Sequence, residues 1–202
     1  MIVADSLRKS FDRNLLWENI SFTLTPGIYC FRGPSGCGKT TLGRILAGLD
    51  TPNSGRVSGV EGRPAVLFQE PRLLPAVSAL DNVACISHGN KGREIARDLL
   101  QDLHFTEEDL NKRPHELSGG MQQRVALARL LLFAKENPGN FALLDEPFRG
   151  LDSHTKAVAA AMIQRHLTGR ITVIITHDES DAALLEGTTY TFDMQKRLIC
   201  PN

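Results

Sequence analysis

Short apolar runs bounded by polar or turn-forming residues recur along the chain. Residues 28–31, 141–144 and 171–176 are the clearest of them. Runs that stay apolar throughout are typical of strands buried on both faces of a parallel sheet. Four further segments have the composition of strands: 20–24, 65–69, 190–193 and 197–200. We therefore expect a mainly parallel sheet at the centre of the fold.

Helical spacing follows the first of these runs directly. Leu42, Ile45, Leu46 and Leu49 stand at positions i, i+3, i+4 and i+7, which predicts an amphipathic helix that buries these four side chains. Gly48 is expected near the end of this helix, because glycine adopts the left-handed conformation that closes many helices. A strand, a loop and a helix thus follow one another within a short stretch of chain.

Residues 70–135 carry helical patterns and little strand signal. A helical segment between two strand-rich stretches indicates an insertion in an α/β fold. We expect one domain, residues 1–202, with an α/β core of about 1–70 and 136–202 and a helical subdomain of about 71–135. The residues that mark two helices of this insertion are Ile95, Leu99, Leu100 and Leu103, and then Met121, Val125, Ala128 and Leu132.

Composition narrows the possible functions. The 202 residues carry 23 basic and 23 acidic side chains, and this zero net charge gives no support for broad binding to nucleic acid. The four cysteines form no C-x-x-C pair, which favours a reducing, cytosolic setting over a zinc site or a disulfide framework. No secretory signal pattern is present, and no apolar run approaches the roughly 20 residues that span a bilayer. Any membrane-spanning part is expected to come from other chains.

The loop after the strand 28–31 has the spacing of a phosphate-binding loop, G-x-x-x-x-G-K-[ST]. Its glycines let backbone N–H groups turn inward, and the helix N-terminus adds partial positive charge. The lysine supplies a charge for the β- and γ-phosphates, and the hydroxyl can ligate Mg²⁺. The residues predicted to bind a nucleotide here are Gly33, Pro34, Ser35, Gly36, Cys37, Gly38, Lys39 and Thr40, with Thr41 beside them.

Two acidic residues, Asp145 and Glu146, end the apolar run 141–144. A carboxylate at the end of such a strand can reach the shell of a Mg²⁺ ion. A second carboxylate beside it can orient or deprotonate an attacking water molecule. A solvated strand end would have the same composition. The phosphate loop upstream favours the catalytic interpretation, with Asp145 at the metal and Glu146 at the water.

A second glycine-rich segment reads Leu117-Ser118-Gly119-Gly120-Met121-Gln122-Gln123-Arg124. A serine and two glycines at the start of a helix offer another anion-binding terminus. The segment resembles the signature sequence of ABC ATPases, and the resemblance extends over nearly the whole chain. It implies a phosphate-loop NTPase core with an N-terminal antiparallel β subdomain and an inserted α-helical subdomain. It also implies that Ser118, Gly119 and Gly120 close on the γ-phosphate held by a partner subunit.

Other positions match the ABC family residue by residue. The resemblance implies that Gln69 touches Mg²⁺ and the attacking water, and that His177 senses the γ-phosphate. It implies that Phe11 stacks on adenine, although an ordinary core or surface phenylalanine is an alternative there. Asp152 ends the loop 149–152, which the family uses to cross a dimer interface. Arg149 departs from the serine that is common at its position.

Cys37 lies inside the phosphate loop, next to helix N–H groups and near Lys39. Both features lower the pKa of a thiol, so one hypothesis is an unusually reactive cysteine that bound ATP protects. The alternative is a small residue tolerated at a variable loop position.

The segment 68–75, with 81–83, resembles the importers of nitrate, sulfonates, taurine and related small solutes, and some importers of pyrimidines or thiamine precursors look similar. Its apolar residues fit either a docking surface for a permease or packing within the helical insertion. These residues are Leu73, Leu74, Val77 and Leu80.

The resemblance thus implies the ATP-hydrolysing subunit of an ABC importer, with ATP and Mg²⁺ as cofactors. Its expected partners are a second copy or a homologous ATPase subunit, membrane-spanning permease subunits and a solute-binding protein, with no nucleic acid. The expected location is cytoplasmic, peripheral on the inner face of the membrane. Two alternatives are a soluble ABC ATPase that acts on nucleic acid or ribosomes, and a simple kinase. The kinase leaves the segment 118–124 unexplained.

Overall fold

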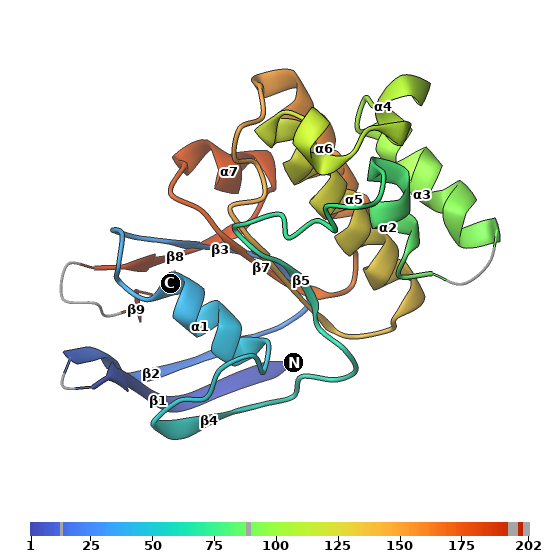
Figure 1. Cartoon of the computed structure of the whole chain (residues 1–202). Coiled ribbons are helices and arrows are strands. Elements are labelled where there is room, and N and C mark those ends of the chain that lie inside the picture. Colours follow the sequence, from blue (N-terminus) through green and yellow to red (C-terminus); the bar gives the residue numbers. More distant parts are fainter. Residues whose placement is uncertain (13, 88–89, 194–197, 200–202) are drawn as a thin grey trace. The chain divides into compact units, whose positions relative to one another are not determined.

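The computed structural model describes residues 1–12, 14–87, 90–193 and 198–199 (Figure 1). The strands are β1 Ile2–Phe11, β2 Asn14–Leu24, β3 Gly27–Arg32, β4 Ser54–Ser58, β5 Ala65–Leu67, β6 Phe141–Asp145, β7 Ile171–Ile175, β8 Thr188–Phe192 and β9 Leu198–Ile199. The helices are α1 Lys39–Leu46, α2 Ala79–Ala84, α3 Asn90–Asp102, α4 Glu107–Asn111, the 3₁₀ helix η1 Pro114–Glu116, α5 Gly119–Glu136, α6 Ser153–His166 and α7 Glu179–Leu184. Of the predicted strand 197–200, Arg197 and Cys200 lie outside the described residues.

Backbone contacts divide the chain into two compact units. Unit 1 consists of Met1–Val66, Gly139–Asp145 and Thr168–Asn202. Unit 2 consists of Leu67–Pro138 and Glu146–Leu167, so it contains the helical segment 71–135 together with α6.

A six-stranded sheet has the order β5-β6-β7-β3-β8-β9. β3 runs parallel to β7 and β8, and β6 runs parallel to β7, whereas β9 is antiparallel to β8. All residues of β6 and β7 are buried, as expected for uninterrupted apolar runs in a parallel sheet. Phe31 and Asp145 both lie opposite Ile175 in the register, so β3, β6 and β7 end together at one edge of the sheet. This architecture confirms the predicted α/β class.

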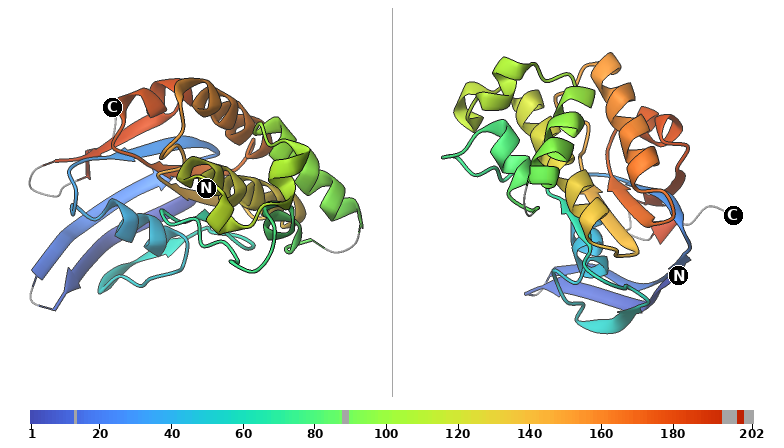
Figure 2. Two further views of the ribbon diagram at one scale, coloured as in Figure 1. Left: turned by 45° about the horizontal axis from the view of Figure 1, so that its top comes forward. Right: turned by 90° about the vertical axis from the view of Figure 1, so that its right-hand side faces the viewer.

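The N-terminal segment of unit 1 forms a second, antiparallel sheet with the order β2-β1-β4. Ile20, Phe22 and Leu24 alternate with exposed residues along β2, which is the pattern of a strand with one buried face. The buried Trp17 lies three residues before Ile20, and the pairing with β1 slips between them, where Asn19 has a φ of 56°. The apolar faces of this sheet, of α1 and of the parallel sheet share one core, with α1 between the two sheets (Figures 1 and 2).

Unit 2 is built around α5. This helix buries residues on all its sides from Gln123 to Ala134, as a helix does when other helices surround it. α2, α3 and α6 pack against it, and α4 packs against α2 (Figure 2). The residues that marked the two helices of the insertion lie within or at the end of α3 and α5.

The end of α1 corrects one prediction. The helix closes at Leu46, and Gly48 adopts the left-handed conformation with a φ of 68°. Leu42, Ile45 and Leu46 are buried as predicted, whereas Leu49 lies beyond the helix and is 46% exposed. The prediction for Leu49 was wrong because Gly48 ends the helical geometry before the chain reaches Leu49.

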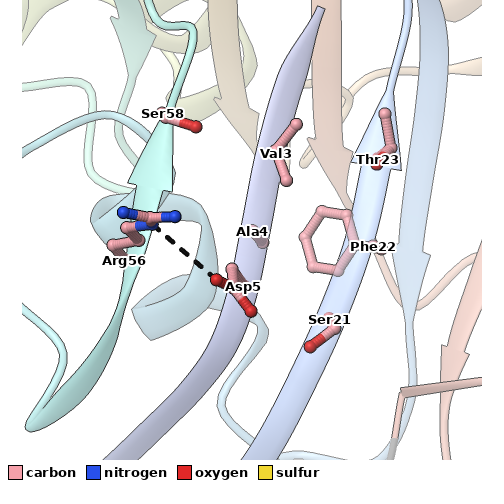
Figure 3. Close-up of a pocket in the computed structure, with 8 residues that line it drawn as sticks. All are labelled: Val3, Ala4, Asp5, Ser21, Phe22, Thr23, Arg56 and Ser58. Carbon is pink, nitrogen blue, oxygen red and sulfur yellow. Dashed lines mark ion pairs between the residues drawn. The ribbon is translucent and has the colours of Figure 1, made fainter.

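An open pocket of about 420 Å³ lies on the antiparallel sheet (Figure 3). Asp5 of β1 and Arg56 of β4 face each other there at 3.7 Å, and both are exposed. Its lining residues are Val3, Ala4, Asp5, Ser21, Phe22, Thr23, Arg56 and Ser58, none of which belongs to the phosphate loop. The pocket is therefore not the predicted nucleotide site.

Among the described residues, no helix has the length and the apolar character that crossing a membrane requires.

Candidate nucleotide-binding site

The phosphate loop lies between β3 and α1 of unit 1, at the edge where the parallel strands end. Gly38 caps α1 with a φ of 99°, and a Cβ atom there would come within 2.4 Å of the Trp17 indole nitrogen. Gly33 is as constrained, because its Cβ would lie 2.8 Å from the Cβ of Phe192. Side chains of β2 lie against Gly38 and Phe192 of β8 lies against Gly33, so neither position has room for a Cβ atom and only glycine fits.

The Lys39 ammonium group lies against the loop. Its Nζ donates hydrogen bonds to the backbone oxygens of Gly33 at 2.8 Å and Pro34 at 3.0 Å. The Cys37 sulfur lies 3.7 Å from the same nitrogen. The cation is therefore held inside the ring of backbone that would surround a phosphate chain.

The N-terminus of α1 is open to an anion. No side chain caps it, and its first turn carries no acidic residue. The first N–H groups of a helix have no partner within the helix and carry partial positive charge. A phosphate group fits this position on both grounds.

Thr40 and Asp145 form the polar pair that the sequence assigned to a metal. The Thr40 hydroxyl donates to a carboxylate oxygen of Asp145 at 3.0 Å. Neighbouring ligands of octahedral Mg²⁺ at about 2.0–2.1 Å lie about 3 Å apart, so these two oxygens have the spacing of adjacent ligands. Hydroxyl and carboxylate oxygens are also the donors that this hard cation prefers.

Burial raises the pKa of Asp145, against the opposing effects of the Thr40 hydrogen bond and the positive charges of Lys39 and Arg44. The side chain is buried at the end of β6. A buried carboxylate gains most from a directly bound cation, because nearby charge then replaces lost hydration. The pair Thr40–Asp145 therefore fits a Mg²⁺ ion.

His177 follows the end of β7, next in the sheet to the strand that carries the phosphate loop. Its side chain is exposed. Because β3, β6 and β7 end together, unit 1 brings the phosphate loop, Asp145 and the start of the His177 loop to one edge. Phe11 ends β1 with 52% of its surface exposed, and the ammonium group of Lys9 lies 5.1 Å from its ring centroid. The ring therefore has a cation at one side and an exposed surface of the kind that can stack on a base.

Unit 2 carries the second glycine-rich segment. Ser118 is the N-cap of α5, and its hydroxyl accepts a hydrogen bond from the Met121 N–H at 3.2 Å. Gly119 faces open space, whereas a Cβ on Gly120 would lie 2.5 Å from the Gly150 oxygen. The start of α5 therefore lies directly against the loop 149–152.

Asp152 acts as a helix cap in this structure. Its carboxylate accepts hydrogen bonds from the N–H groups of His154 and Thr155, both at 3.0 Å, at the start of α6. The hydrogen bond from the Thr155 N–H, and next that from the Thr155 hydroxyl, lower the pKa of Asp152 to about 2. The cap fixes the end of the loop 149–152, and its sequence signal is the short polar residue before a helix.

Sequence reasoning missed Gln123. This buried glutamine of α5 donates to the backbone oxygen of Glu146 at 3.0 Å, and Glu146 itself has a φ of 53°. The left-handed conformation is unusual outside glycine and has to be held by its surroundings. Gln123 stands within the signature-like segment, but no local pattern distinguishes a buried glutamine from an exposed one.

Arg129 and Asn82 were also missed. Arg129 donates to the backbone oxygens of Pro71 at 2.7 Å and Arg72 at 3.1 Å, just after the exposed Gln69. Asn82 accepts from the Leu74 N–H at 2.7 Å and donates to the Leu74 oxygen at 3.1 Å. α5 and α2 thus hold the segment that follows Gln69 by its backbone.

The candidate residues fall into two groups. Unit 1 contains Phe11, the phosphate loop, Thr40, Thr41, Asp145 and His177, and unit 2 contains Gln69, Ser118, Gly119, Gly120, Glu146 and Asp152. A strand–phosphate-loop–helix unit in a parallel sheet, with a carboxylate at the end of another strand at the same edge, defines a phosphate-loop NTPase.

The family within this class follows from comparison with known proteins. The family model described as "ABC transporter" matches residues 17–149, and the chain belongs to this family. The aliphatic sulfonates import ATP-binding protein SsuB 1 of Rhodococcus jostii (strain RHA1) is 41% identical over 176 residues, which covers 83% of this chain and 69% of the relative. SsuB of Corynebacterium glutamicum is 39% identical over 196 residues, which covers 93% of this chain and 78% of the relative. The chain is an ATPase subunit of the ABC type.

Two solved structures share the fold. A dimeric, post-hydrolysis state of the ATP-binding cassette MJ0796, bound to ADP and Pi, has a TM-score of 0.84 at 25% identity, with 99% of this chain and 98% of that chain covered. A dimeric structure of MJ0796, described as a bacterial ABC transporter cassette, has a TM-score of 0.78 at 26% identity, with 95% and 94% covered. These two structures confirm the predicted fold. The names of the relatives agree with the predicted resemblance to the subgroup of importers that includes the sulfonate importers.

Proposed function

We propose that this chain binds Mg-ATP as one half of a pair of ATPase subunits and drives the import of a small solute. The observation that carries the proposal is the presence of two glycine-rich helix N-termini in one chain. α1 and α5 both begin without an acidic residue in the first turn. One terminus suffices for one nucleotide, so the second is available to a nucleotide held by a partner subunit.

The residues of unit 1 hold the nucleotide and the metal in this proposal. Backbone N–H groups of the phosphate loop and the Lys39 ammonium group bind the phosphates. Thr40 and Asp145 hold Mg²⁺. Phe11 stacks on the base. When bound, Mg-ATP supplies the phosphoanhydride that is cleaved, and its metal draws charge from the γ-phosphate.

The remaining roles belong to residues near the attacking water and to the partner. Glu146 accepts the proton of the water, while Gln69 and His177 orient groups around the γ-phosphate. The start of α5, from Ser118 to Gly120, and the loop that ends at Asp152 act on the nucleotide of the partner subunit. Each of these side chains supplies positioning or charge, which is the main catalytic need of phosphoryl transfer.

Import requires partners outside this chain. The dimeric cassettes among the solved structures support a pair of ATPase subunits. The relatives named as import ATP-binding proteins support membrane-spanning permease subunits as its partners. A solute-binding protein would deliver the solute, and the ATPase would lie on the inner face of the cell membrane. The exposed Leu74 in the segment after Gln69 supports a docking surface there.

Mixing two inactive variants tests the composite site. Lys39→Ala removes the cation of the phosphate loop. Gly119→Asp places a negative charge at the start of α5, where a new Cβ atom meets no neighbour within 4 Å. In a head-to-tail pair made of one chain of each variant, one of the two sites has both an intact phosphate loop and an intact start of α5.

An equal mixture of the two variants should recover roughly a quarter of the wild-type ATPase rate, since about half the pairs are mixed and one of their two sites is intact. A mixture no more active than its components would contradict the proposal.

A further inference from the structure

The loop that carries His177 is fixed by a buried hydroxyl and a buried carboxylate. Thr176 follows β7 and is fully buried, and Asp181 in α7 is 3% exposed. The Thr176 hydroxyl donates to the Asp181 carboxylate at 2.5 Å. The oxygen of the Thr176 hydroxyl also accepts a hydrogen bond from the Asp178 N–H at 3.0 Å. Thr176 thus donates its hydroxyl proton to Asp181 and accepts a hydrogen bond from the residue that follows His177.

The backbone around this contact is anchored to the strand before the phosphate loop. The Thr176 N–H donates to the Phe31 oxygen in β3 at 3.3 Å. The negative charge of Asp181 reaches the same strand: burial first, and then this charge, raise the pKa of the Cys30 thiol to about 12. Asp181 is a buried residue of α7, and α7 packs against β3.

The three residues 176–178 form a closed turn around His177. The hydrogen bond from the Asp178 N–H back to the Thr176 hydroxyl is a turn of the kind that serine and threonine make with backbone. On the far side of the turn, Asp178 accepts the Ser180 N–H at 2.8 Å and caps α7. The backbone of His177 is held on both sides, while its imidazole is exposed.

We propose that Thr176 and Asp181 are positioning residues, which set the direction of the His177 side chain before a nucleotide arrives. The inference rests on the proposed role of His177 at the γ-phosphate. Without the carboxylate, the Thr176 side chain loses a contact that holds its rotamer, and another rotamer takes its oxygen away from the Asp178 N–H. His177 then samples several directions, and only part of the population has the geometry that phosphoryl transfer needs.

Three variants separate positioning from packing. Thr176→Val keeps the volume and removes the hydroxyl, and Thr176→Ser keeps the hydroxyl and removes a methyl group. Glu179→Ala is the matched control: Glu179 begins α7 two residues after His177, and its side chain is 85% exposed, whereas that of its partner Arg32 is 23% exposed. A carboxylate this exposed is screened by water and contributes little to stability, so this variant should behave as the wild type.

The first measurement is amide exchange of Asp178 by nuclear magnetic resonance in the nucleotide-free chain. Thr176→Val should exchange at least about fivefold faster than the wild type, and Thr176→Ser and Glu179→Ala should exchange at about the wild-type rate. An unchanged rate in Thr176→Val would overturn the inference, because the hydroxyl would then not hold the turn.

The second measurement is steady-state ATP hydrolysis by the ATPase in the assembly in which the wild type is active. Thr176→Val should lower kcat about tenfold with KM within about twofold, and Thr176→Ser should recover most of the loss.

In a His177→Ala background, Thr176→Val should add less than about a twofold loss, because the residue it positions is absent. Equal losses in both backgrounds would overturn the inference and leave the role of His177 intact. A His177→Ala variant with normal kcat would instead refute the proposed role of His177 and the inference with it.

Discussion

The side chain of Lys39 is hydrogen-bonded to the backbone of the phosphate loop. Its ammonium group already lies against the backbone oxygens of Gly33 and Pro34, so the positive charge is in place before any phosphate arrives. A preorganised charge loses little entropy on binding, and its contact with an anion is a charge-assisted hydrogen bond. Most of the affinity contributed by this side chain should therefore appear in the binding of the nucleotide itself.

Lys39→Ala should weaken Mg-ATP binding by roughly 1.5–3 kcal/mol, which is about 10- to 150-fold in Kd. The loss follows from removing the charged donor while the backbone of the loop remains. Isothermal titration calorimetry of the full chain measures the affinity, and thermal unfolding reports any damage to the fold. Lys135→Ala, at an exposed lysine in the last turn of α5, is the matched control. An unchanged affinity in Lys39→Ala would refute the binding role.

The described cysteines differ strongly in burial. Cys37 is 2% exposed and Cys30 is fully buried, whereas Cys85 is exposed. A thiol must be accessible to its reagent, so the burial of Cys37 opposes fast labelling. The structure therefore favours the interpretation of Cys37 as a small residue that fills the loop.

Alkylation with a limiting thiol reagent should modify Cys85 first, Cys37 later and Cys30 last. With a pKa of about 12, only about one Cys30 in ten thousand is a thiolate at pH 8. Mass spectrometry of the peptides gives the order, and unfolded protein gives the reference in which all thiols react. Mg-ATP should slow the labelling of Cys37 alone. Faster labelling of Cys37 than of Cys85 would restore the hypothesis of an activated thiol.

At the scale of elements, unit 2 holds the segment after Gln69 by its backbone and leaves side chains outward. Asn82 binds Leu74 through both its N–H and its oxygen, while the Leu74 side chain is 47% exposed. Arg129 fixes Pro71 and Arg72 in the same way. Leu80 of the predicted surface is 1% exposed and belongs to the core. Packing within the helical unit thus accounts for Leu80, whereas docking to a permease stays a prediction for Leu74.

Leu74→Asp should weaken the capture of permease subunits and leave ATP affinity within about twofold, because the substituted side chain is outside the core. A charge placed in an apolar contact costs several kcal/mol unless it is paired. Pull-down with the membrane-spanning subunits, together with melting temperature and ATP affinity on one preparation, makes the measurement. Leu49→Asp is the matched control, at a leucine that is 46% exposed in unit 1. A stable Leu74→Asp variant with normal capture would exclude this residue from the docking surface.

The sequence predicted the elements whose cause is local. Uninterrupted apolar runs identified β3, β6 and β7, and glycine spacing identified the phosphate loop and the start of α5. The prediction for Leu49 was wrong because Gly48 breaks the period on which it depended.

The residues that hold the candidate site were not predictable in the same way. Gln123, Arg129 and Asn82 act on backbone oxygens or N–H groups far along the chain. Their residue types favour an exposed position, and only the tertiary fold shows that they bind backbone. A single sequence therefore indicates the groups proposed to bind the nucleotide more readily than the groups that hold the site in place.

At the scale of the whole molecule, the proposed role of Glu146 as the base offers a way to arrest a pair of chains with ATP bound. It follows Asp145 directly, and Gln123 holds its backbone in the left-handed conformation. Its carboxylate is half-buried, so a side chain of the same size and without the charge should leave the turn in place. ATP binding and ATP cleavage can then be separated in one variant.

Glu146→Gln should bind Mg-ATP with about wild-type affinity and hydrolyse it about 10²–10⁴-fold more slowly, because an amide cannot accept the proton of the attacking water. With two composite sites and no hydrolysis, the ATP-bound chains should accumulate as a dimer. Size-exclusion chromatography with Mg-ATP measures the dimer, and phosphate release measures turnover. Lys39→Ala/Glu146→Gln is the control, because a chain that binds Mg-ATP much more weakly should remain monomeric at an ATP concentration near the wild-type Kd. A Glu146→Gln variant that stays monomeric and turns over at the wild-type rate would show that another group serves as the base.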